Sequence, residues 1–135
     1  MALKDLTIDY GKVQEEQIEQ IVGSYIRYDE RQGLVILGRE GRELSVDQKI
    51  LVYLIARKGW RFFEFKKEEE RPAEEARPKE IAEGIFENRS TVRRHLMELK
   101  NDGWVHKAVG GGYIVPNHIL DEAENIITRE TKKED

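Results

Sequence analysis

Two short apolar-periodic segments separated by a polar turn constrain the fold of this chain more than any other feature. The first begins at Arg77 and Pro78, where the missing N–H of proline costs no helical hydrogen bond. Its apolar residues recur at helical spacing, and they are Ile81, Ala82, Ile85 and Phe86. The second segment follows the turn 87–90, whose side chains can cap a helix, and ends at Gly103. Its apolar residues are Val92, Leu96 and Leu99. The sequence therefore predicts two helices joined by a tight turn, each with one apolar face.

A stretch with strand-like composition follows Gly103. It consists of Trp104 and Val105, the glycine run 110–112, and the β-prone run 113–115, which Pro116 ends. Glycines between two β-prone runs are typical of a turn. The sequence thus predicts a small hairpin directly after the second helix.

These motifs together resemble a known family. Glu-Ile-Ala at 80–82, Ser-Thr-Val seven residues later, His-Leu at 95–96 and Gly-Trp-Val before a hairpin are similar to the winged helix-turn-helix of prokaryotic transcription regulators, including archaeal ones. The resemblance spans residues 44–116. It implies a mainly α fold with small β (α+β), in which the second helix of the pair contacts DNA and the hairpin forms the wing.

The most apolar predicted helix precedes the pair. Ser45 and Gln48 match a capping box, and Gly59 ends the helix. Its apolar residues are Val46, Ile50, Leu51, Tyr53, Leu54 and Ile55. The resemblance implies that this helix packs beneath the pair. The aromatic residues that follow are expected to complete the core: Trp60, Phe62, Phe63 and Phe65. The alternative for these aromatic residues is an exposed surface that binds a partner. We expect the charged segment 66–77 to be a solvated loop or mobile linker.

Residues 1–43 predict an N-terminal α/β extension. The alternation of Leu6, Ile8 and Tyr10 indicates an edge strand or an ordered arm. An amphipathic helix is expected over 12–26. Two β-prone runs, 25–28 and 34–37, predict a hairpin with Gly33 at the strained turn position.

Residues 117–135 predict a C-terminal helix followed by a charged tail. Asn117 is the expected N-cap. The helix carries an apolar stripe made of Ile119, Leu120, Ala123, Ile126 and Ile127. This stripe has to pack either against the chain's own core or against the same helix of a second subunit.

Composition narrows the class of protein. The chain has 135 residues, 37% of them charged and 39% hydrophobic, with no cysteine, which is typical of one globular domain with an ionic surface. This usage resembles that of heat-adapted intracellular proteins. No basic N-terminus leads into an apolar segment, and no apolar run approaches the roughly 20 residues that span a bilayer. We therefore expect a cytoplasmic protein without a membrane partner.

Charge distribution matters more here than the net charge of −4, which alone disfavours nucleic acid. The range 89–94 holds three arginines and no acid. Helical geometry directs Ser90, Thr91 and Arg94 away from the apolar face, with Arg93 at its flank. Arginine pairs with guanine, and serine or threonine bonds phosphate or base. The candidate DNA-binding residues are Arg89, Ser90, Thr91, Arg93, Arg94 and, in the predicted wing, Lys107. The alternative for the arginines is a solvated, salt-bridged helix face.

Catalytic and metal chemistry find little support in the sequence. His95, His106 and His118 are eleven and twelve residues apart, with no carboxylate at ligand spacing. The glycine run 110–112 neither opens a helix nor precedes Lys-Ser or Lys-Thr, so it favours a hairpin turn over a phosphate-binding loop. We expect no enzyme activity, no metal site and no cofactor.

Two hypotheses for function follow. The first is a sequence-specific DNA-binding transcription regulator that binds double-stranded DNA, as a homodimer because two half-sites multiply a weak single contact. The second is a winged-helix protein–protein adaptor in a transcription or replication assembly. The acidic balance favours the second hypothesis, as does a glycine wing tip that leaves Lys107 as the nearest cation.

Overall fold

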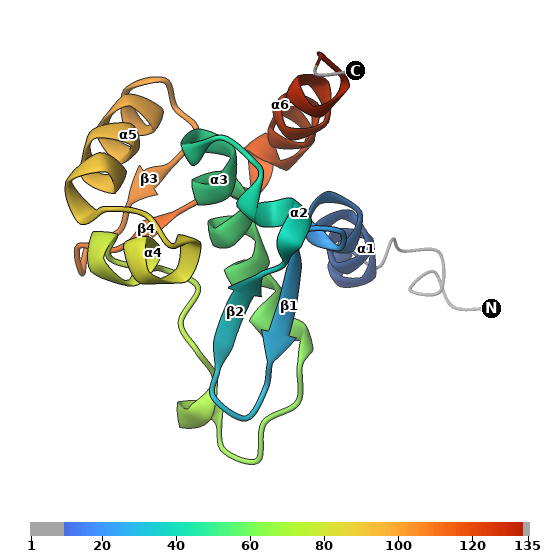
Figure 1. Ribbon diagram of the computed structural model, residues 1–135. Coiled ribbons are helices and arrows are strands. Elements are labelled where there is room, and N and C mark those ends of the chain that lie inside the picture. Colours follow the sequence, from blue (N-terminus) through green and yellow to red (C-terminus); the bar gives the residue numbers. More distant parts are fainter. Residues whose placement is uncertain (1–9, 134–135) are drawn as a thin grey trace.

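The computed structural model describes residues 10–133, which form a mixed α+β fold that is mostly helical (Figure 1). The predicted strand or arm at Leu6 and Ile8 lies outside these residues, and Tyr10 begins a helix instead. The helices are α1 (Tyr10–Val22), α2 (Arg39–Arg42), α3 (Val46–Lys58), α4 (Pro78–Ile85), α5 (Arg89–Asn101) and α6 (Leu120–Lys133). The strands are β1 (Ile26–Asp29), β2 (Leu34–Leu37), β3 (His106–Lys107) and β4 (Tyr113–Ile114).

Helix α3 is the centre of the core. The predicted capping box is confirmed: Ser45 Oγ accepts a hydrogen bond from Gln48 N at 3.2 Å, and Gln48 Oε1 accepts one from Ser45 N at 3.0 Å. Every residue of α3 from Ile50 to Lys58 is buried. Because α1, α4, α5 and α6 all contact α3, the helix is covered on all sides and needs no polar face.

The hairpin β1–β2 is antiparallel, with Ile26 opposite Leu37 and Tyr28 opposite Val35. Gly33 adopts φ +66° in its turn, as predicted. Val35 and Leu37 are buried, whereas Leu34 and Ile36 are exposed, so the two faces of β2 differ. Helix α1, which was expected over 12–26, ends at Val22. The short helix α2 was not predicted.

A second small sheet follows α5. Strands β3 and β4 pair antiparallel, and the turn between them includes Gly111 at φ +93°. Ala76, just before α4, forms a bridge with Tyr113: each backbone N–H donates to the other residue's carbonyl, at 3.1 and 2.7 Å. Along the chain, helix α3 is followed by the bridge residue Ala76, helices α4 and α5, and the hairpin β3–β4.

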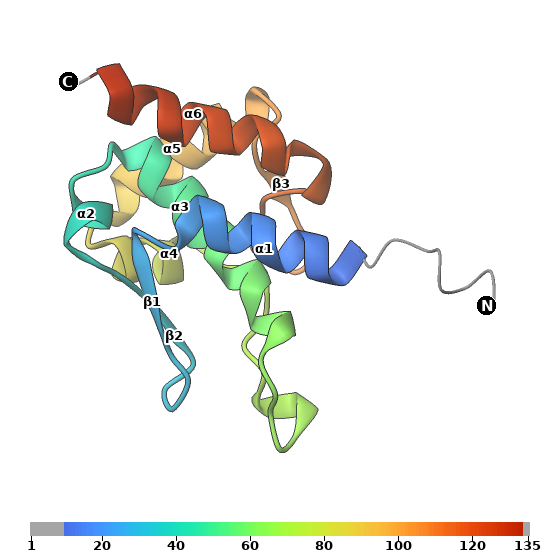
Figure 2. The same cartoon turned by 90° about the vertical axis from the view of Figure 1, so that its right-hand side faces the viewer.

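Helices α1 and α6 lie side by side against α3 (Figure 2). Four residues of the predicted C-terminal stripe are buried within this chain: Ile119, Leu120, Ala123 and Ile127. Ile126 is half-buried. The stripe thus packs against the chain's own core, and it offers no large free apolar face to a second copy. Asn117 does not cap the helix, and its Oδ1 instead accepts a hydrogen bond from Lys58 Nζ at 2.7 Å.

The aromatic residues after α3 complete the core as expected. Trp60 is buried, and Phe62, Phe63 and Phe65 pack against the core while half-buried. The segment 66–77 is mostly exposed, but it is tied to α3 at one end by Arg57 and Lys58. The prediction for Phe86 is wrong: its side chain is 61% exposed, because the chain leaves the helical conformation at this residue.

Candidate nucleic-acid interface

A three-residue connection joins α4 to α5. Phe86 adopts a left-handed backbone, φ 59° and ψ 42°, and the next N–H, that of Glu87, donates to Ala82 O at 3.0 Å. Asn88 then caps α5, because its Oδ1 accepts a hydrogen bond from Ser90 N at 2.8 Å. The chain reverses direction within these residues, so the start of α5 lies at an outer corner of the molecule (Figure 1).

Helix α5 is fixed firmly on α3. Its apolar residues Val92, Leu96 and Leu99 are buried, as predicted. His95 is half-buried, and its Nδ1 shares a hydrogen bond with Asp47 Oδ1 at the start of α3, at 2.7 Å. Lys49 of α3 pairs with Glu87 in the turn at 2.9 Å. The outer face of α5 is therefore presented by a helix with little freedom to rotate.

That outer face carries the predicted candidates. Arg89, Ser90, Arg93 and Arg94 are exposed and Thr91 is half-exposed. The Ser90 hydroxyl also lies 2.7 Å from Asn88 Oδ1, to which it donates. The first turn of α5 holds no acidic side chain. Its free backbone N–H groups and helix dipole therefore add to the positive charge of the arginines.

The hairpin after α5 brings a second group of cations near its tip. Lys107 is exposed on β3. The prediction that Lys107 is the cation nearest to the glycine tip is wrong, because Arg77 Nη2 donates a hydrogen bond to Gly110 O at 2.9 Å. Arg77 is exposed and directly precedes α4. It lies 33 positions before Gly110 in the sequence. No local pattern in the sequence signals this contact.

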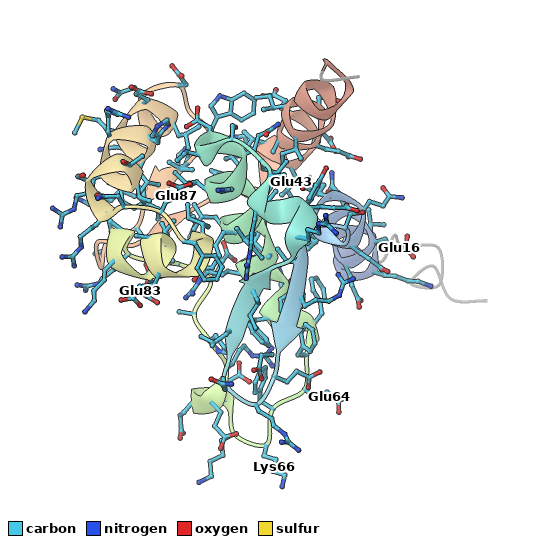
Figure 3. All side chains as sticks on the ribbon, in the orientation of Figure 1. Glu16, Glu43, Glu64, Lys66, Glu83 and Glu87 are labelled. Carbon is cyan, nitrogen blue, oxygen red and sulfur yellow. The ribbon has the colours of Figure 1, made fainter. Side chains whose placement is uncertain are left out.

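Lys79 is a further basic residue that sequence reasoning left out of the site. It lines a hollow of about 290 Å³ together with Arg89, Ala82 and the carboxylates of Glu83 and Glu87. Figure 3 shows Glu83 on the outer side of α4 and Glu87 closer to α3. The charge between α4 and α5 is thus mixed, whereas the start of α5 itself is basic.

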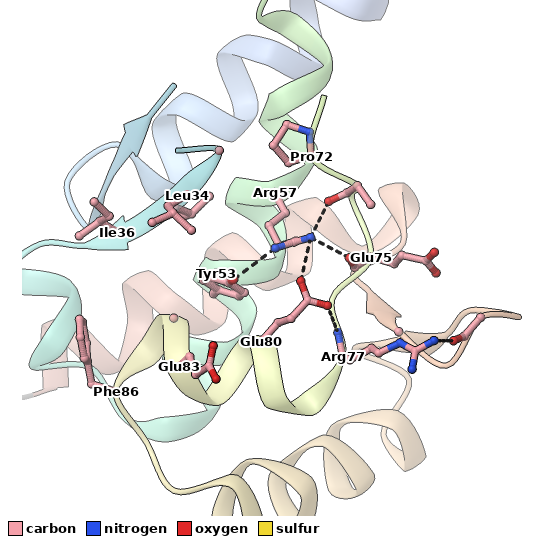
Figure 4. A pocket seen from close by; sticks show the side chains of 16 residues that line it. Leu34, Ile36, Tyr53, Arg57, Pro72, Glu75, Arg77, Glu80, Glu83 and Phe86 are labelled. Carbon is pink, nitrogen blue, oxygen red and sulfur yellow. Dashed lines mark hydrogen bonds and ion pairs between the residues drawn. The ribbon is translucent and has the colours of Figure 1, made fainter. Parts of the chain in front are cut away.

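A larger cleft of about 720 Å³ lies on another side of α4 (Figure 4). Its walls are β2, the segment 72–77, α4 and the tip of the β3–β4 hairpin. Arg57 forms its inner end: Nη1 donates to Tyr53 Oη at 3.2 Å, and Nε and Nη2 donate to the carbonyl groups of 73–75 at 2.8–3.2 Å. Glu80 Oε2 lies 3.7 Å from Arg57 Nη2. Sequence reasoning missed this cleft, because segments far apart in the chain build it.

Within residues 10–133, no group of three or more His, Asp or Glu side chains is placed to hold a metal ion. The rings of His106 and His118 come together at a centroid distance of 6.1 Å.

The same part of the chain contains no helix with the length and apolar character needed to cross a membrane.

No family model matches the chain, and neither a curated protein nor a solved structure matches it. The geometry of the start of α5, of the β3–β4 hairpin and of the cleft therefore carries the functional argument.

Proposed function

We propose that the protein is a sequence-specific DNA-binding transcription regulator built on a winged helix-turn-helix. In this proposal α3, α4 and α5 are its three helices, α5 is the recognition helix and the β3–β4 hairpin is the wing. The observation that carries the proposal is the start of α5, whose charged residues are all basic and exposed, on a helix that is fixed to α3.

A major groove about 12 Å wide admits one α-helix, and recognition helices place their N-terminal residues at the base edges. Arg93 and Arg94 lie on the exposed side of that N-terminal half. In this pose Arg94 reaches a base edge, whereas Arg89 at the turn and Lys107 in the wing contact phosphates. Arg77, bonded to the wing tip, supplies a further phosphate contact.

A homodimer in the cytoplasm remains part of the proposal. Two copies would bind two half-sites one helical turn apart, which multiplies the affinity of a small single contact. The α6 stripe is buried within the chain, so a dimer would have to use another surface.

The test begins with selection of bound duplexes from a random pool, which supplies an enriched site. Arg94→Ala should weaken binding to that site by about 1–3 kcal/mol and relax the preference at one base position. Lys107→Ala should weaken binding to the enriched and scrambled duplexes alike and reduce the salt slope by about 1. Titrations of both variants at several salt concentrations measure these effects.

Lys66→Ala is the matched control, because Lys66 is an exposed cation at the far end of the molecule from α5 (Figure 3). It should leave the affinity for both duplexes unchanged. Equal, small losses for Arg94→Ala on the enriched and scrambled duplexes would remove the recognition role from α5.

The second candidate function is a winged-helix adaptor that binds a protein. The exposure of Phe86 (61%), Leu34 (47%) and Ile36 (38%) around the cleft favours it. Binding to duplex DNA that weakens steeply with salt supports the regulator. Retention of a protein partner without any DNA binding supports the adaptor.

A further inference from the structure

The cleft presents the edge of a strand. Four consecutive residues, 33–36, line it, whereas one face of a strand would contribute only alternate residues. Gly38 N donates to Tyr25 O at 2.7 Å, and antiparallel ladders repeat every second residue, so Ile36 and Leu34 bond to β1. Val35 therefore turns its N–H and C=O away from β1 and toward the cleft. Among the described residues no other segment bonds these two groups.

The opposite wall of the cleft does not pair with β2. The carbonyl oxygens of 73–75 already accept hydrogen bonds from Arg57, so they are not available to β2 (Figure 4). At one end Pro72 closes the cleft, because its Cγ lies 3.1 Å from the position of a Cβ on Gly33. The volume of about 720 Å³ falls within the roughly 300–1,000 Å³ of sites that enclose a ligand. The space beside β2 therefore admits a strand of about four residues.

The cleft offers apolar contacts beside that edge. Leu34 and Ile36 project from β2, and Phe86 lies on the opposite side at the end of α4 (Figure 4). Phe86 is held in a left-handed conformation that bulky residues rarely adopt, and Arg42 stacks on its ring at 4.4 Å. A strand whose apolar residues occupy alternate positions would cover Leu34 and Ile36 on one face.

The charged side chains that line the cleft indicate which residues occupy the other alternate positions of such a strand. Three carboxylates line the cleft: Glu75, Glu80 and Glu83. Its two cations are engaged, since Arg57 bonds backbone carbonyls and pairs with Glu80 at 3.7 Å, and Arg77 bonds Gly110 O. Glu83 has no ion-pair partner within the described part of the chain, and its carboxylate projects into the cleft (Figure 4). Lysine or arginine is therefore the complementary charge.

We propose that this cleft binds an extended segment of a protein partner, in which apolar residues alternate with lysine or arginine. The segment adds a third strand to β2 through the N–H and C=O of Val35. Its apolar side chains cover Leu34 and Ile36, and a basic side chain pairs with Glu83. The site uses neither Arg94 nor Lys107, so it is independent of the proposed DNA contacts.

The test uses the full ¹⁵N-labelled chain and a defined probe, the hexapeptide acetyl-(Lys-Val)₃-amide. Titration should shift the amide signal of Val35 saturably and slow its hydrogen exchange by at least about tenfold. The same peptide with glutamate in place of lysine should bind at least about tenfold more weakly. A peptide N-methylated at its central residues, which cannot donate to Val35 O, should lose binding.

Glu83→Gln should weaken the lysine peptide several-fold, whereas the matched exposed change Glu64→Gln should not. Equal binding of the N-methylated peptide, or shifts confined to α5, would overturn the proposal. A Val35 signal that changes with protein concentration alone would assign the edge of β2 to a second copy of this chain, which would overturn it too.

Discussion

At the scale of single residues, Gly84 sets how closely α4 approaches α3. A Cβ at this position would lie 2.4 Å from Tyr53 Cε2 and 2.7 Å from Tyr53 Cζ. A glycine-to-alanine change within a helix usually stabilises by about 1 kcal/mol. Gly84→Ala should instead lower the free energy of unfolding by about 1–3 kcal/mol, because the buried ring has to move. Urea unfolding measures the change.

The neighbouring exposed residue provides the control for that prediction. Glu83→Ala should alter the free energy of unfolding by no more than about 0.5 kcal/mol, since Glu83 is exposed. A rise in stability for Gly84→Ala would mean that α4 and Tyr53 are not in the contact described.

Tyr28 makes stability depend on pH. Its hydroxyl donates to Ala56 O, and burial raises the pKa of Tyr28 far above its usual value of 10. Between pH 10 and that raised pKa the folded protein retains a proton that the unfolded chain has lost. The free energy of unfolding is therefore intact below pH 10 and falls above it, by up to about 1.4 kcal/mol per pH unit.

Denaturant unfolding at pH 9, 10 and 11 tests this dependence. Tyr28→Phe should remove this decline of stability with pH. The lost hydrogen bond should cost only about 0.5–1.5 kcal/mol, because Ala56 O still accepts a hydrogen bond from Gly59 N. Tyr25→Phe should keep the decline. The prediction for Tyr28 fails if both variants show the same slope.

At the scale of elements, two buried cations at the end of α3 hold the segment that leads to α4. Arg57 bonds three consecutive carbonyls, and Lys58 Nζ contacts Glu74 Oε2 at 2.9 Å as well as Asn117 Oδ1. Arg57→Met should lower the free energy of unfolding by at least about 2 kcal/mol, because charged hydrogen bonds are lost. Hydrogen exchange should rise selectively over 71–77.

Arg61→Met is the control for Arg57→Met. Arg61 is exposed, donates a hydrogen bond to Gln14 and stacks on the ring of Phe62. It has no described contact with 71–77, so exchange over 71–77 should not change. Uniformly faster exchange in Arg57→Met would indicate global destabilisation rather than release of this segment.

The elements show which features the sequence could predict. Ser45 and Gln48 act within one helical turn, so the start of α3 is readable from spacing alone. Gly33 and the apolar spacing of α5 are likewise local signals. The exposure of Phe86 was not predictable from periodicity, because the left-handed turn at that residue interrupts the helical pattern.

The candidate site divides in the same way. The basic start of α5 was predictable, because exposure on a helix follows from the positions of its apolar residues. The contact of Arg77 with Gly110 and the cleft beside β2 were not, because they depend on how separate elements pack. Periodicity carries no information on contacts between residues so far apart.

At the scale of the whole molecule, the three predicted segments 1–43, 44–116 and 117–135 share a core over their described residues. Ile18 of α1, Ile55 of α3 and Ile127 of α6 belong to one buried cluster. The chain should therefore unfold in one cooperative transition. Ile127→Ala should lower the free energy of unfolding by about 2–5 kcal/mol. Far-UV circular dichroism and hydrogen exchange in α5 should report the same midpoint.

Asn125→Ala, an exposed change on the same helix, is the control and should have little effect. If Ile127→Ala released α6 while α5 kept the midpoint of the unaltered protein, α6 would be a detachable arm and the shared core would be excluded.

The placement of the two tryptophans has a consequence for spectroscopy. Trp60 is 1% exposed, stands among aromatic rings and has an indole N–H without a hydrogen-bond partner in the described residues. Trp104 is half-buried where α5 gives way to the β3–β4 hairpin. The unaltered protein thus contains two fluorophores of different polarity. Emission at the blue edge of the spectrum comes from Trp60 and reports the core. Emission at the red edge comes from Trp104, which a dissolved quencher can reach, and reports the junction of α5 with the hairpin.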